Sequence, residues 1–102
     1  MSTPEGKVKD KVKKLLTLFG AYQHWPVQTG FGAPALDCNG IHVGRGFAVE
    51  TKAPGKKLTP RQELIKRDIE AAGGVVFVVG EKLAGKSYSG MRELAHWLQQ
   101  KP

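Results

Sequence analysis

Hydrophobic residues along the first twenty positions recur at helical spacing, with polar and mostly basic residues between them. The apolar positions are Val8, Val12, Leu15, Leu16 and Phe19, which fall on one side of a helix. The preceding Ser2-Thr3-Pro4-Glu5 has the signature of a helix start, with Ser2 as N-cap and Glu5 three residues later. Gly20 is expected to end this helix.

The middle of the chain reads as short strands separated by glycine. We expect strands over 21–27 and 35–37, with a glycine-rich loop over 28–34 between them. Asn39-Gly40 is a strong signal for a hairpin turn. The return strand is then predicted over 41–43 and 46–52, with Gly44 and Gly46 indicating a bulge.

The last third of the chain contains two further helices around one strand. Thr59-Pro60-Arg61-Gln62 predicts a helix start with a capping box, and Gly73-Gly74 predicts its end. The run 75–79 (VVFVV) is continuously apolar, which is typical of a central strand covered on both faces. An amphipathic helix is predicted over 91–100. The inward residues are expected to be Leu64, Ile65, Ile69 and Ala72 in the first of these helices, and Met91, Leu94, Ala95 and Leu98 in the second.

This order of elements, α-β-β-β-α-β-α, predicts an α/β fold: a small mixed β-sheet flanked by helices. The helix after residue 59 would connect two parallel strands as a crossover. With 102 residues, the chain is expected to form a single domain spanning 1–102. No apolar run is long enough to span a bilayer, and the first residues lack an apolar leader. The single cysteine, Cys38, fits a reducing compartment, so we expect a cytoplasmic protein without membrane contact.

The net charge of +7 is concentrated in two segments. Residues 1–20 carry five lysines and two acids, and residues 51–70 carry six basic and three acidic residues. Concentrated positive charge suits contacts with phosphates, although a solvated basic surface explains it equally well. If the partner is DNA, the candidate phosphate-binding residues are Lys7, Lys11, Lys14, Lys56, Lys57 and Arg61.

Charged residues also occur on a strand that otherwise reads as buried. Glu50 and Lys52 are two residues apart and therefore point the same way. Asp37, from the preceding strand, could lie across from Glu50. Two carboxylates that meet repel each other unless a cation lies between them, and hard oxygen ligands suit Mg²⁺. Lys52 would then lie near both a metal-bound water and a phosphate.

Two helix starts could bring further polar groups to this cluster. Glu5 falls on the inner stripe of the first helix, and Gln62 on the inner stripe of the second. Each residue alone also has an ordinary explanation. Glu5 and Gln62 suit caps, Asp37 suits a turn, and Glu50 with Lys52 suits an exposed edge-strand pair.

The ordered set of Glu5, Pro34-Ala35-Leu36-Asp37, Glu50-Thr51-Lys52 and Gln62 resembles the PD-(D/E)xK nuclease superfamily. Within it, the chain is most similar to the VRR-type, Holliday-junction-resolvase-like nucleases of phages and bacteria. The phrase FAVETKAPGKKLTPRQ (47–62), followed by Ala-Gly-Gly and an apolar strand, looks like the core of that family. Here two residues separate Pro34 from Asp37, whereas the family has the proline and the acid adjacent.

The resemblance implies a restriction-endonuclease-like fold and a DNA endonuclease that hydrolyses phosphodiesters, with branched DNA as one substrate such an enzyme could prefer. It implies that Asp37 and Glu50, with the backbone carbonyl of Thr51, bind Mg²⁺ or Mn²⁺. Lys52 would be the catalytic lysine, and Glu5 and Gln62 would support the metal-bound water and the site. A homodimer in a bacterial or phage-infected cell is expected, because symmetric cutting of two strands is simplest with two-fold symmetry. The helix carrying Trp97 is a candidate interface.

Two other functions remain open from the residues alone. The chain could bind DNA through the same fold without cutting it, which its charge would also explain. It could instead be a small interaction protein whose basic face meets an acidic partner. DNA binding that weakens with salt would distinguish the first from the second.

Overall fold

The computed structural model describes residues 3–27, 35–81, 83–84 and 87–100. These residues form three helices and six strands, two of the strands only two residues long. In chain order the elements are α1 (Pro4–Leu18), β1 (Tyr22–His24), β2 (Cys38–His42), β3 (Arg45–Thr51), α2 (Pro60–Ala71), β4 (Val75–Val79), β5 (Leu83–Ala84), β6 (Ser87–Tyr88) and α3 (Met91–Gln99). The predicted α/β class is confirmed, and the β5–β6 hairpin is an addition to the predicted order.

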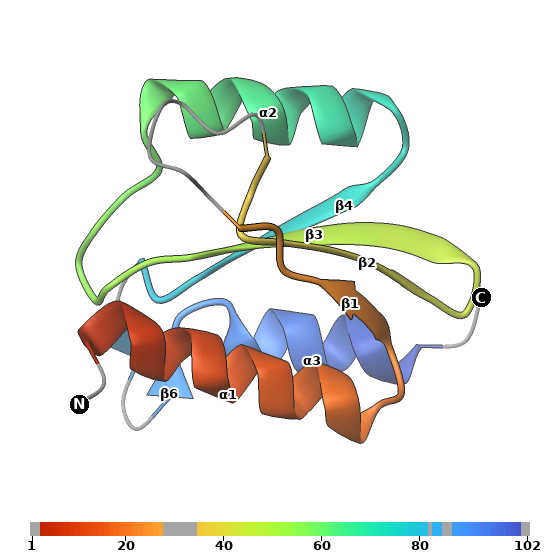
Figure 1. Ribbon diagram of the computed structural model, residues 1–102, viewed down its shortest axis with the longest axis horizontal. Coiled ribbons are helices and arrows are strands. Elements are labelled where there is room, and N and C mark those ends of the chain that lie inside the picture. Colours follow the sequence, from red (N-terminus) through yellow and green to blue (C-terminus); the bar gives the residue numbers. More distant parts are fainter. Residues whose placement is uncertain (1–2, 28–34, 82, 85–86, 101–102) are drawn as a thin grey trace.

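The main sheet has the strand order β1-β2-β3-β4. β1, β2 and β3 pair antiparallel, whereas β4 pairs parallel to β3. The connection between the two parallel strands is α2, as the sequence predicts. Figure 1 shows α2 on one face of the sheet and α1 with α3 on the other.

The hydrophobic core lies between the sheet and the α1–α3 layer. Val8, Val12 and Leu16 of α1 are fully buried there, and they meet Phe47 and Val49 of β3. The helical stripe predicted from the sequence therefore does face the sheet. Successive strand residues point to opposite faces, so Glu50 points away from this core and toward α2.

The two helix starts are capped by threonines. Thr3 Oγ1 accepts a hydrogen bond from the Gly6 N–H (2.9 Å) and is the N-cap of α1. The prediction of Ser2 as this cap is wrong; Ser2 itself lies outside the described residues. Thr59 caps α2 with the predicted capping box. Gly20 and Gly73, after α1 and α2, both have positive φ angles, 71° and 95°, as expected of helix ends.

The predicted hairpin turn at Asn39-Gly40 is wrong, because both residues lie inside β2. The turn is Val43-Gly44, with φ angles of 46° and 83°, between the paired residues His42 and Arg45. Two positive φ angles in a two-residue loop match the strand twist. Gly40 has a different role: a Cβ there would lie 2.5 Å from Cζ of Phe47, so glycine gives the Phe47 ring its space.

Two other strand predictions differ from the structure. The strand expected over 21–27 is limited to Tyr22–His24, since Pro26 cannot donate to the ladder. Residues 35–37 are not a strand, and Asp37 immediately precedes β2. The glycine-rich loop expected over 28–34 lies outside the described residues.

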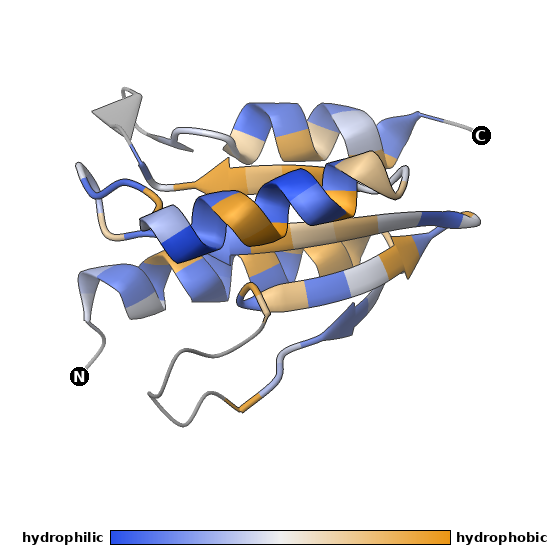
Figure 2. Cartoon of the chain, turned by 90° about the horizontal axis from the view of Figure 1, so that it is seen from above, coloured by the Kyte–Doolittle hydropathy of each residue, from blue (hydrophilic) through white to orange (hydrophobic). Residues whose placement is uncertain are grey.

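Within the described sheet β4 is an edge strand, so the prediction of a central strand is wrong. Helices do lie against both of its faces, α3 on the core side and α2 on the other. Only Val79 of its five residues is fully buried. Its other face meets α2, which has no buried residue of its own, and Leu64 is 55% exposed. Figure 2, seen from the α2 side, shows this helix as largely hydrophilic. The expected inward positions of Leu64 and Ala72 are thus also wrong.

α3 packs its strongest apolar side chains into the core. Leu94, Trp97 and Leu98 are buried, and the Trp97 ring lies 5.4 Å from that of Phe47. Arg45 stacks on the same indole, with its guanidinium carbon 4.4 Å from the ring centre. Trp97 is therefore a core residue. The role of α3 as a subunit interface stays a prediction.

None of the helices in the described part of the chain is both long and apolar enough to cross a membrane.

Candidate active site

The ends of β2 and β3 bring Asp37 and Glu50 into direct contact. Cys38 pairs with Val49, and one residue further along the ladder the Asp37 N–H donates to Glu50 Oε1 (3.1 Å). Oδ2 of Asp37 in turn accepts from the N–H (2.9 Å) and the hydroxyl (2.7 Å) of Thr51. Strand pairing and three hydrogen bonds thus fix two carboxylates beside one another, as expected from the sequence.

Glu50 and Lys52 form an ion pair in a buried position. Glu50 is 4% exposed and Lys52 9%, and Nζ of Lys52 lies 3.7 Å from Oε2 of Glu50. The Lys52 N–H donates to the Val79 carbonyl (2.8 Å), which extends the β3–β4 ladder past the end of β3. A Cβ at Gly80 would lie 2.1 Å from the Lys52 carbonyl oxygen, so glycine is required where the backbones approach. The alternative of an exposed edge-strand pair is wrong.

Gln62 joins the same carboxylate from α2. Its Nε2 donates to Oε2 of Glu50 (2.9 Å), and its Oε1 accepts from the Thr59 N–H (2.9 Å). The Gln62 N–H donates to Thr59 Oγ1 (3.2 Å). One side-chain amide thus both closes the predicted capping box and contacts Glu50. The role of Gln62 in a catalytic site stays a prediction.

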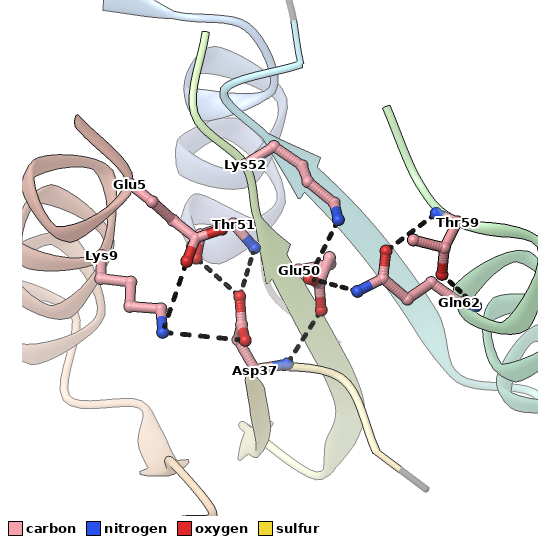
Figure 3. A network of polar contacts seen from close by, with 8 residues as sticks. All are labelled: Glu5, Lys9, Asp37, Glu50, Thr51, Lys52, Thr59 and Gln62. Atoms are coloured by element: carbon pink, nitrogen blue, oxygen red, sulfur yellow. Dashed lines mark hydrogen bonds and ion pairs between the residues drawn. The ribbon is translucent and has the colours of Figure 1, made fainter. Parts of the chain in front are cut away.

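Glu5 reaches the cluster through Lys9. Nζ of Lys9 lies 3.9 Å from Oε2 of Glu5 and 3.9 Å from Oδ1 of Asp37. Figure 3 shows these two α1 residues on one side of β3 and Gln62 on the other. The sequence did not predict this contact of Lys9 with Asp37. The only local signal was the spacing of Glu5 and Lys9, which suits an i,i+4 ion pair.

The surroundings of Glu50 raise its pKa from 4.5 to about 7. Burial is the largest cause, because it disfavours the charged form, and the negative charge of Asp37 adds to it. The Lys52 ammonium and the hydrogen bond from the Asp37 N–H act in the opposite direction. A further positive charge near the two carboxylates would therefore stabilise ionised Glu50.

The oxygens of this cluster suit a hard divalent cation in their chemistry. In the part of the chain that the structure describes, no three His, Cys, Asp or Glu side chains form a ready-made cation site. The convergent donors are the two carboxylates, and Mg²⁺ commonly takes one or two carboxylates together with waters and substrate phosphates. The observed Thr51 contacts involve its N–H and hydroxyl, so its carbonyl as a ligand stays a prediction.

Two further titratable groups, His42 and Cys38, lie in the core and do not join the cluster. His42 hydrogen-bonds the Leu98 carbonyl through Nε2 (2.9 Å) and so ties β2 to α3. Burial raises the pKa of the Cys38 thiol to about 12, which leaves it without thiolate at neutral pH. Cys38 is thus a core residue.

The predicted phosphate-binding side chains are all exposed. They come from α1, from the loop before α2 and from the first turn of α2, and they are Lys7, Lys11, Lys14, Lys56, Lys57 and Arg61. Val8, Val12 and Leu16 occupy the opposite side of α1, so the basic residues of α1 face solvent. Their role in binding DNA stays a prediction.

Comparison of the chain with protein-family models, with curated proteins and with solved structures gave no match.

Proposed function

We propose that this chain is a metal-dependent deoxyribonuclease that hydrolyses phosphodiester bonds. The observation that carries the proposal is the contact between Asp37 and Glu50, with Lys52 in an ion pair on the same glutamate. Glu50 is buried beside the partly buried Asp37, and neighbouring carboxylates repel each other unless positive charge lies close to both. Cation binding would account for this arrangement.

Asp37 and Glu50 would hold Mg²⁺ or Mn²⁺, with the Thr51 carbonyl as a further ligand. Such a cation polarises the phosphoryl oxygens and lowers the pKa of a bound water. The Lys52 ammonium is held close to the carboxylates and would neutralise charge that develops on the phosphate. Gln62 orients Glu50 through its hydrogen bond. These roles agree with the resemblance to the VRR-type nucleases, and so does the small α/β fold.

The exposed basic residues of α1 and of the 56–61 segment would bind the DNA backbone next to the site. Contacts of this kind set the position of the duplex without reading its sequence. We extend the proposal to a preference for branched DNA and to a two-fold homodimer in the cytoplasm of a bacterial or phage-infected cell. A monomer mass by light scattering at working concentration would contradict the dimer.

The test is cleavage of a labelled four-way junction beside a matched linear duplex, in Mg²⁺ and in EDTA. Nicking is expected in Mg²⁺ alone, and it should be abolished in Glu50→Gln and Lys52→Ala. The control is Glu70→Gln, which removes an exposed acid of α2 that pairs with Lys66. This variant should cleave like the unmodified protein.

Full cleavage by purified Glu50→Gln would overturn the proposal. If the unmodified protein binds DNA but does not cleave it with any metal, the chain is a DNA-binding module without catalysis. The exposed lysines of α1, which do not depend on the carboxylates, are the observation that favours this second function.

A further inference from the structure

Lys9 occupies a position between two carboxylates from different parts of the chain. Its ammonium lies 3.9 Å from Glu5, one turn earlier in α1, and 3.9 Å from Asp37, just before β2. The side chain of Asp37 is 12% exposed, whereas those of Lys9 and Glu5 are 34% and 45% exposed. Lys9 is therefore more exposed than Asp37, and it lies between the side chains of Glu5 and Asp37 (Figure 3).

The two oxygens of Asp37 are held differently. Oδ2 accepts two hydrogen bonds from Thr51, which orient the carboxylate firmly. Oδ1 faces the Lys9 ammonium at a distance longer than a hydrogen bond. A cation that uses Oδ1 would thus meet a positive charge about 4 Å from its ligand, and the two cations would repel each other.

We infer that Lys9 is the internal counter-cation of Asp37, and that a divalent cation displaces its ammonium from Asp37 onto Glu5. The inference rests on the proposed metal site. Lys9 balances the charge of Asp37 in the metal-free protein. The ammonium can leave Asp37 without losing all its partners, because Glu5 lies at the same distance on the other side.

Glu5 acts in this scheme as a positioning residue. It makes no hydrogen bond or ion pair with Asp37 or Glu50 that the structure records. Its contact with the cluster runs through Lys9, and its negative charge adds only the smallest of the effects that raise the pKa of Glu50. The function implied for Glu5 by the family resemblance, support of a metal-bound water, would require direct contact with the metal shell. The two roles predict different behaviour when Lys9 is absent.

The test is calorimetric titration of Mn²⁺ into the DNA-free protein. Lys9→Ala is expected to bind Mn²⁺ about tenfold more tightly, the order expected for removing one partly screened charge about 4 Å away. Alanine is a strong helix former, so α1 should persist. The matched control is Lys13→Ala, which removes the same charge one turn further along α1, where Lys13 lies over the Trp25 ring. It should leave the affinity almost unchanged.

A double-mutant cycle with Glu5→Gln separates the two roles of Glu5. In the presence of Lys9, Glu5→Gln should weaken Mn²⁺ binding severalfold, because the ammonium then has Asp37 as its remaining partner. In the Lys9→Ala background, Glu5→Gln should have a much smaller effect, because only the weak action of its charge on Glu50 is left to remove. Equal weakening in both backgrounds would overturn the inference and assign Glu5 to the metal itself.

The failure of this inference is distinguishable from that of the proposed function. If the unmodified protein binds Mn²⁺ and Glu50→Gln abolishes binding, the metal site stands. Unchanged affinity in Lys9→Ala then overturns the inference alone. If the unmodified protein binds no Mn²⁺, both proposals fall.

Discussion

The Asp37 N–H donates a hydrogen bond to Glu50 Oε1 across the ends of β2 and β3, at 3.1 Å. This contact joins a residue outside regular structure to the buried end of a strand. It holds the two carboxylates together and also partly offsets the burial of Glu50. The remaining oxygen of Glu50 accepts from Gln62 and pairs with Lys52. Both oxygens of this glutamate therefore have polar partners.

The raised pKa of Glu50 predicts that the metal-free protein loses stability as the pH rises. Below pH 4.5 the carboxyl is protonated in both the folded and unfolded states, so the stabilisation is fully present. Between 4.5 and about 7 the unfolded chain releases the proton while the folded protein keeps it, and the free energy of unfolding falls with pH. The total loss should be on the order of 3 kcal/mol.

Urea unfolding in EDTA between pH 4.5 and 8 measures this effect when the protein is compared with Glu50→Gln. Subtracting the two pH profiles cancels the contributions of other groups. The unmodified protein should show the extra loss, whereas Glu50→Gln should not. Parallel profiles would show that Glu50 titrates near its ordinary value. Because cation binding needs the ionised carboxylate, Mg²⁺ affinity should rise as the pH passes 7.

The two functions of Gln62 can be separated by comparing it with its capping partner. Thr59→Ala removes the hydroxyl that accepts from the Gln62 N–H, while Gln62→Ala removes the amide that contacts both Thr59 and Glu50. Each should lower the free energy of unfolding by about 1 kcal/mol. Only Gln62→Ala should also reduce cleavage, by about tenfold or more, because it frees a carboxylate of the proposed metal site.

Thermal or urea unfolding and the junction-cleavage assay, applied to both variants, provide the measurement. Equal loss of cleavage in the two variants would mean that Gln62 acts through the start of α2 and not through Glu50.

Gly40 should be intolerant of a side chain although it lies in a strand. A Cβ there would lie 2.1 Å from the Tyr22 carbonyl oxygen and 2.5 Å from the Phe47 ring. Gly40→Ala should therefore cost about 2–3 kcal/mol through overpacking. At Gly46, on the neighbouring strand, a Cβ would meet no atom within 4 Å, and Gly46→Ala should change stability by about 0.5 kcal/mol or less. Similar unfolding midpoints for the two variants would contradict the role assigned to Gly40.

Short-range geometry explains the features that the sequence predicts correctly. The capping box at Thr59 and Gln62 and the helix ends at Gly20 and Gly73 depend on residues a few positions apart. The apolar stripe of α1 depends on one helical period. The pair Glu50 and Lys52 points to one side because strand residues alternate. All of these features are determined by short-range geometry, and the sequence contains that geometry directly.

Tertiary packing decided the features that the sequence did not predict. Asn39-Gly40 has the composition of a turn, but Gly40 lies inside β2, where the Phe47 ring packs against it. The turn is formed by Val43-Gly44 instead. The apolar composition of 75–79 fits a central strand, yet no strand pairs beyond β4 in the described sheet. The contact of Lys9 with Asp37 joins residues 28 positions apart. The register of distant strands and the docking of α1 decide such contacts, and neither leaves a periodic signal in the chain.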